Sequence, residues 1–132
     1  MKIAVAVVRI LLGLLFLFAS VAVLFNLVPK PPLTGAVKTF QDGLDASGYM
    51  MKLIKIPELI CAIALIAGRY VALAVVVLFP IVINIFLFHA FLAPDGLPVA
   101  IFTLAATLFL VFAYWPHYAG LLKAKRIVNQ SI

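Results

Sequence analysis

The chain has 132 residues, of which 67% are hydrophobic and 11% are charged. A soluble domain typically carries about a quarter charged residues. A chain of this composition could not hide its apolar side chains from water, so a soluble domain is excluded. Each membrane-spanning helix needs roughly 20 apolar residues, and four such helices with short connections use nearly the whole length. We therefore predict a single all-α transmembrane domain over residues 1–132.

The net charge of the chain is +6, from ten Lys and Arg residues against four Asp and Glu residues. These cations stand at the ends of apolar runs instead of clustering on one polar face, which argues against a nucleic-acid partner. They are typical of anchors at a membrane interface, so the lipid bilayer is the predicted partner. The single cysteine, Cys61, excludes an intrachain disulfide and a CxxC redox pair.

The first apolar run, over about residues 3–28, predicts a retained first span. It is longer than the apolar part of a secretory signal, and no clear cleavage site follows it. Pro29, Pro31 and Pro32 end this helix. Over residues 33–48, apolar residues recur at helical spacing among polar ones, which predicts a short amphipathic helix that lies at the membrane surface or caps the bundle. The apolar residues of this stripe are Leu33, Val37, Phe40 and Leu44.

Three further spans are predicted over about residues 49–68, 70–92 and 97–118. The second span of the chain is the least ordinary, because charged residues shorten its apolar run. Pro80 inside the third span frees a backbone carbonyl and predicts a kink. An aromatic belt closes the fourth span with Tyr114, Trp115, His117 and Tyr118. The whole pattern predicts an integral membrane four-helix bundle with a short amphipathic helix between helices 1 and 2.

Four spans place both termini on the same side of the membrane. Six cations then fall on the side of the termini and four on the other side. This bias favours cytoplasmic N- and C-termini in a bacterial-type cytoplasmic (inner) membrane. We interpret four residues as topology and interface anchors, with the first of them snorkelling to the headgroups: Arg9, Arg69, Trp115 and Tyr118.

Ionisable groups inside the hydrocarbon layer cost at least about 2.5 to 3.5 kcal/mol each, so those within the spans need partners or water. Lys55 and Glu58 are three residues apart, lie on one helix face and can pair. At about 1.5 Å per residue, Asn26, Asn84 and His89 fall in the same outer half of the membrane as this pair. We predict that these five residues line a polar pocket that opens outward. An interhelical hydrogen-bond clamp is the alternative.

The geometry of a regular helix limits this pocket, because Asn84 and His89 point in directions that differ by roughly 140°. Asn84 is therefore the better predicted partner for Glu58. His89 and His117 lie near opposite membrane faces, so they cannot share one haem iron within a subunit. The sequence contains no cluster with metal-ligand spacing and no evident pair of nucleophile and base. We predict no haem, no metal and no catalytic residue.

Four short motifs stand in order along the chain: Arg9-x-x-x-Gly13-x-x-Phe16, Lys55-x-x-Glu58, Gly68-Arg69, and Pro80 through Asn84 to Phe88-His89. Their order and spacing resemble the DoxX-like family of small four-helix membrane proteins, over roughly Val8 to Leu122. Many members of that family have glycine soon after the acidic residue of helix 2. Cys61 and Ala62 stand there in this chain.

The resemblance implies an accessory or quinone-docking subunit of a membrane oxidoreductase system, with Glu58 at the matching acidic position. Quinone is the implied cofactor, and a partner protein would carry the redox centre. Two alternatives stay open: a small proton-linked transporter or permease in which Glu58 titrates, and a purely structural membrane bundle. The sequence also leaves open whether the chain forms a homo-oligomer.

Overall fold

The computed structural model describes residues 1–27 and 32–124, and this part of the chain is all-helical. Its elements are α1 (Lys2–Leu24), α2 (Gly35–Ala46), α3 (Met50–Ala67), α4 (Val71–Phe91), the short 3₁₀ helix η1 (Pro94–Gly96), α5 (Leu97–Ala113) and α6 (Trp115–Ala119). The predicted end of the first span at residue 28 lies outside the described residues, as do Pro29 and Pro31.

Within residues 1–27 and 32–124, three segments are long and apolar enough to cross a membrane: Lys2–Leu24, Val71–Phe91 and Pro94–Ala113. They correspond to the first, third and fourth predicted spans, and they make this a membrane protein. Helix α3, the second predicted span, is also 18 residues long. It is not among the three, because Lys52, Lys55 and Glu58 lie within it.

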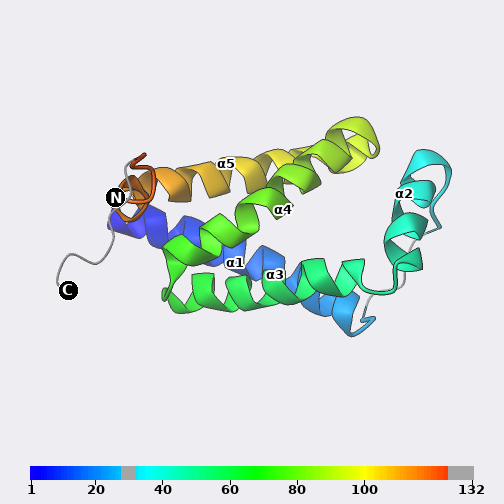
Figure 1. Ribbon diagram of the computed structural model, residues 1–132, viewed down its shortest axis with the longest axis horizontal. Helices are drawn as coiled ribbons and strands as arrows, with labels where there is room; N and C mark the ends of the chain where they lie inside the picture. Colours follow the sequence, from blue (N-terminus) through cyan, green and yellow to red (C-terminus); the bar gives the residue numbers. More distant parts are fainter. Residues whose placement is uncertain (28–31, 125–132) are drawn as a thin grey trace.

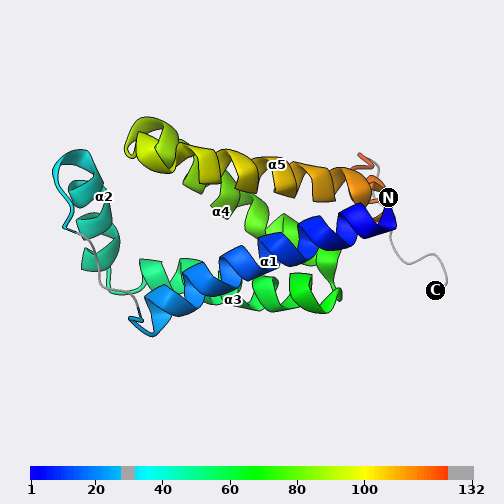
Figure 2. The same ribbon diagram turned by 180° about the vertical axis from the view of Figure 1, so that it is seen from behind.

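The long helices form two pairs, with α1 lying against α3 and α4 lying against α5. The pairs are closest near the turn that joins α3 to α4, and they diverge toward the end of the molecule where α2 lies (Figures 1 and 2). The N-terminus and α6 lie at the same end as the α3–α4 turn. The molecule is therefore narrow at one end and open at the other, and α2 occupies the open end.

The buried core is thin, and most of the outer surface is apolar. Leu12, Phe16, Leu65, Leu78 and Leu110 lie at the centre of the core. Large apolar side chains cover the outside, including Phe18, Leu73 and Phe112. A soluble protein rarely exposes contiguous apolar surface of this extent, whereas lipid tails accept it.

Close packing of α1 on α3 depends on Gly13. A Cβ atom at this position would lie 2.8 Å from Ile66 Cγ1 and 3.2 Å from the carbonyl oxygen of Ala62. Since a glycine lets two backbones approach, α1 and α3 come close together at this point. Phe16, one turn later on α1, is buried on the same face.

Arg9 caps the C-terminus of α3. Its Nη1 atom donates a hydrogen bond of 2.8 Å to the Leu65 carbonyl and lies 3.5 Å from that of Ile66. Carbonyls in the last turn of a helix have no intrahelical donor, and a cation there also complements the helix dipole. Gly68 ends α3 in the left-handed conformation, with φ of +74°, and has no room for a Cβ beside the Arg9 guanidinium. Arg9 was interpreted as snorkelling to headgroups, but its guanidinium is bound to a neighbouring helix.

The predicted fourth span over 97–118 is divided in the structure. Helix α5 ends at Ala113, and α6 begins after Tyr114, which has non-helical backbone angles. Pro116 is the physical reason, because it has no amide hydrogen for the Phe112 carbonyl and its ring restricts the preceding residue.

Of the predicted anchors, Arg69 and Trp115 are exposed, but Tyr118 is buried. The Tyr118 hydroxyl donates a hydrogen bond of 2.7 Å to the Ala72 carbonyl and so fastens α6 to the start of α4. Burial raises the pKa of the Tyr118 phenol, and the neighbouring Tyr114 adds to this rise. Tyr118 acts as a contact between helices.

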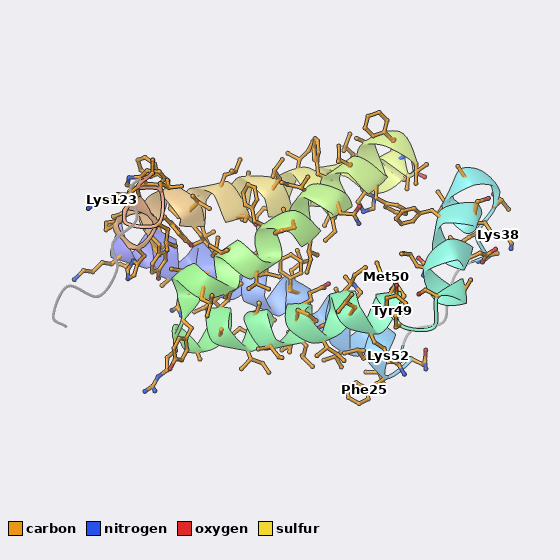
Figure 3. All side chains as sticks on the ribbon, viewed as in Figure 1. Phe25, Lys38, Tyr49, Met50, Lys52 and Lys123 are labelled. Atoms are coloured by element: carbon orange, nitrogen blue, oxygen red, sulfur yellow. The ribbon has the colours of Figure 1, made fainter. Side chains whose placement is uncertain are left out.

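Helix α2 is the amphipathic helix expected between the first two spans, and it covers the open end of the bundle. Val37, Phe40, Gln41 and Leu44 are its half-buried residues. The ring of Phe40 lies 5.3 Å from that of Phe88 on α4, measured between centroids. Figure 3 labels Lys38 on the opposite side of α2, turned away from the bundle.

Candidate functional site

A cavity of about 160 Å³ lies where α2, α3 and α4 meet at the open end of the bundle. Its polar wall is formed by Gln41, Lys55, Glu58, Asn84 and His89. The apolar wall includes Phe40 of α2 and Phe88 of α4. Four of the five residues predicted to form a pocket therefore line one cavity, and α2 covers it.

The central feature of this cavity is an ion pair within α3. The Nζ atom of Lys55 lies 3.3 Å from Oε2 of Glu58 and 3.5 Å from Oε1. The Glu58 side chain is 1% exposed and that of Lys55 is 15% exposed. Removing two charges from water can cost more free energy than their mutual attraction returns, so a buried ion pair is weak evidence for stability. A charged pair that is buried in the wall of a cavity is therefore a candidate functional site.

Asn84 does not fill the role of partner to Glu58 that the sequence suggested. Lys55, on the same helix, holds the carboxylate, while α4 diverges from α3 at this end (Figure 1). The Asn84 side chain is exposed, and among the described residues its amide has no hydrogen-bond partner. Asn84 thus borders the cavity, and both the oxygen and the NH₂ group of its side-chain amide are available to a ligand.

His89 has a structural contact as well as a place in the cavity wall. Its Nδ1 atom lies 3.1 Å from the carbonyl oxygen of Ala93, so Nδ1 carries the proton in this contact. The ring fills the space beside Gly96, where a Cβ atom would clash with it. His89 therefore braces the turn from α4 to α5, and its Nε2 atom is left as an acceptor in the neutral ring.

Asn26 is not brought to this cavity. It borders a separate cavity of about 360 Å³, between the end of α1, α2 and the start of α3, together with Lys52. Gln41 and Met51 line both cavities and so stand between them. Counting residues along a helix predicts how deep a residue lies in the bundle. It does not predict on which side of α2 the residue lies, and this is why Asn26 was wrongly assigned to the polar pocket.

Sequence reasoning missed two contributors, Gln41 and Pro57. Gln41 shares the half-buried stripe of α2 with Phe40 and Leu44, so its helical spacing was the available signal. Pro57 precedes Glu58 and lies inside α3. It has no amide hydrogen to donate to the carbonyl of Leu53, so α3 has one backbone hydrogen bond fewer beside the ion pair.

The cavity is suited to a small polar group. Its volume equals about five water molecules at roughly 30 Å³ each, and drug-sized ligands need roughly 300 Å³ or more. Lys55, Gln41 and Asn84 offer hydrogen-bond donors, and Glu58 offers an acceptor. Within residues 1–27 and 32–124, no group of three or more His, Cys, Asp or Glu side chains could hold a metal ion.

Comparisons of the chain with family models, with curated proteins and with solved structures find no match. The resemblance to the DoxX-like family stays a prediction from the motifs. The structure adds geometry to those motifs: Arg9 and Gly68 meet at the end of α3, Gly13 lies at the α1–α3 contact, and Glu58 lines the cavity.

Proposed function

We propose that this protein is a four-helix membrane bundle of the DoxX-like kind that docks the polar ring of a quinone dissolved in the membrane. It would serve as an accessory subunit, and a partner protein would carry the redox centre of the oxidoreductase system. The observation that carries the proposal is the buried Lys55–Glu58 pair in the wall of a cavity under α2. The membrane is the bacterial-type cytoplasmic (inner) membrane, with both termini in the cytoplasm.

The distribution of side chains on α3 supports a membrane crossing by this helix in addition to the three candidate spans. The charge of Glu58 is turned inward, and apart from Lys52 the exposed large side chains of α3 are apolar: Leu53, Ile56, Ile60 and Ile63. At about 1.5 Å per residue, 18 residues give about 27 Å, close to the roughly 30 Å of a hydrocarbon core. Lys52 is exposed near the start of the helix, at the end of the bundle where headgroups would lie (Figure 3).

The donors and acceptors of the cavity match the two redox forms of a quinone ring. A quinone carbonyl accepts hydrogen bonds, which the Lys55 ammonium and the Asn84 amide can donate. A quinol hydroxyl donates, and Glu58 can accept. Phe40 and Phe88 offer aromatic surface to the ring. The small volume requires a compact single ring.

The test is quinone binding to the purified protein in lipid nanodiscs. The Lys55→Met variant should lose at least about tenfold in affinity, because a charged donor is removed. Lys52→Met is the matched control, since Lys52 is exposed one turn earlier on the same helix and does not line this cavity, and its affinity should stay unchanged. Asn84→Leu serves as a second variant that leaves the ion pair intact, and it should weaken binding several-fold. Absence of binding by the unchanged protein would refute the proposal.

A second candidate function is a small proton-linked transporter. Pro57 lies next to Glu58, and Pro80 lies next to Ile81 in the opposite wall of the cavity. Prolines at these points let both helices bend around the carboxylate. Solute flux in proteoliposomes that disappears in Glu58→Gln, without quinone binding, would favour this function.

A further inference from the structure

A second, larger cavity lies between α3 and α4 nearer the narrow end of the bundle. It is an open groove of about 510 Å³, lined by residues from Pro57 to Ala64 on α3, by Tyr70, and by residues from Leu73 to Val77 on α4. Its lining residues are apolar except for a cysteine and the tyrosine. Ile60 and Leu73 at this groove are both 62% exposed, so the groove is open on the outer surface of the bundle.

The groove and the polar cavity are consecutive along the same pair of helices. On α3, Cys61 of the groove lies one turn from Glu58 of the polar cavity. On α4, one stripe with spacings of three and four residues lines both spaces: Ala74, Val77, Ile81, Asn84 and Phe88. An apolar groove thus leads along α4 to a site that is polar.

We propose that the groove holds the hydrocarbon chain of the same ligand whose ring enters the polar cavity. The ligand class is then a compact ring that bears a long apolar chain, and neither a free ring nor a water-soluble solute. This inference rests on the proposed function and specifies its substrate.

The stripe of α4 that lines both spaces is what selects this occupant. A phospholipid chain hangs from a headgroup at the membrane surface, whereas this groove leads to a polar site within the span that only a small head can enter. Lipid tails are as apolar as the groove, so the chain gains no hydrophobic free energy on leaving lipid. The contribution of the groove must come from close packing, which a bulky substitution can remove.

The experiment compares a ubiquinone analogue that carries a decyl chain with the same ring without the chain, in nanodiscs and after correction for partition into lipid. The form with the chain should bind about tenfold more tightly to the unchanged protein. Leu73→Trp fills the groove and should abolish this difference while binding of the bare ring stays the same. Leu87→Trp is the matched control, because Leu87 is also an exposed leucine of α4 but lines neither space, and it should change neither affinity.

A photoreactive group at the end of the decyl chain provides an independent readout. Its crosslinks should fall on the segments 57–64 and 70–77, and excess unlabelled ligand should remove them. Equal binding of the two ring forms, or crosslinks elsewhere, would overturn the inference and leave the quinone site standing. Failure of both forms to bind would overturn the proposed function and the inference together. Crosslinks that ordinary phospholipid displaces equally well would identify the groove as a lipid site and also overturn the inference.

Discussion

The Nζ atom of Lys55 lies 3.3 Å from Oε2 of Glu58, whose side chain is only 1% exposed. The two residues are one turn apart on α3, so the pair needs no contribution from another helix. This local pairing leaves the groups across the cavity, such as the Asn84 amide, free for a ligand. It also makes the pair sensitive to removal of either member.

We expect the two single variants of this pair to be less stable than the double variant. Lys55→Met leaves a buried carboxylate without a counter-charge, and loss of one partner of a buried pair typically costs about 3 to 5 kcal/mol. Lys55→Met combined with Glu58→Leu removes both charges and should recover most of that loss. Thermal unfolding of the three variants in detergent measures the coupling. Additive losses would mean that the pair makes no net interaction.

The contact between Arg9 and Gly68 gives a second prediction. Arg9→Ala removes the charged donor to the Leu65 carbonyl and should cost about 1.5 to 3 kcal/mol of stability. Gly68→Ala should be destabilising as well, because φ is +74° and the Arg9 guanidinium occupies the space of a Cβ. Gly43→Ala is the control: Gly43 lies in α2 with open space around its Cβ position, and alanine there should be neutral or raise stability by up to about 1 kcal/mol. If Gly68→Ala and Gly43→Ala changed the melting temperature equally, the proposed cap of α3 by Arg9 would be contradicted.

Close approach of α1 to α3 is tested at Gly13. Gly13→Leu should lower stability by about 1 to 3 kcal/mol, because Ile66 and the Ala62 carbonyl already surround the position. Gly120→Leu introduces the same side chain where nothing lies within 4 Å, so the melting temperature should hardly change. If Gly13→Leu had the same melting temperature as the unchanged protein, the close contact between α1 and α3 would have to lie elsewhere.

The sequence predicted the Lys55–Glu58 pair because helical spacing alone decides a contact within one helix. Counting along each helix also predicted that Asn84 and His89 lie at the same level as this pair, and all four residues line one cavity. It did not predict that Asn26 and Glu58 would line different cavities, because that depends on where α2 lies. The contact of Arg9 with the end of α3 could be predicted in part, because Arg9 and Gly68 fall at the same depth in antiparallel helices. Their contact further required α1 and α3 to be neighbours, which periodicity does not specify.

Membrane topology gives the last prediction, and it separates four spans from three. In a background of Cys61→Ala, Lys38→Cys places a thiol on the exposed side of α2, and Lys123→Cys places one at the opposite end (Figure 3). With four spans and cytoplasmic termini, a membrane-impermeant maleimide added to intact cells should label Lys38→Cys and leave Lys123→Cys unlabelled until the cells are lysed. If only α1, α4 and α5 crossed the membrane, both positions would lie on one side and would be labelled together or protected together. The reverse pattern of labelling would keep the four spans and invert their orientation.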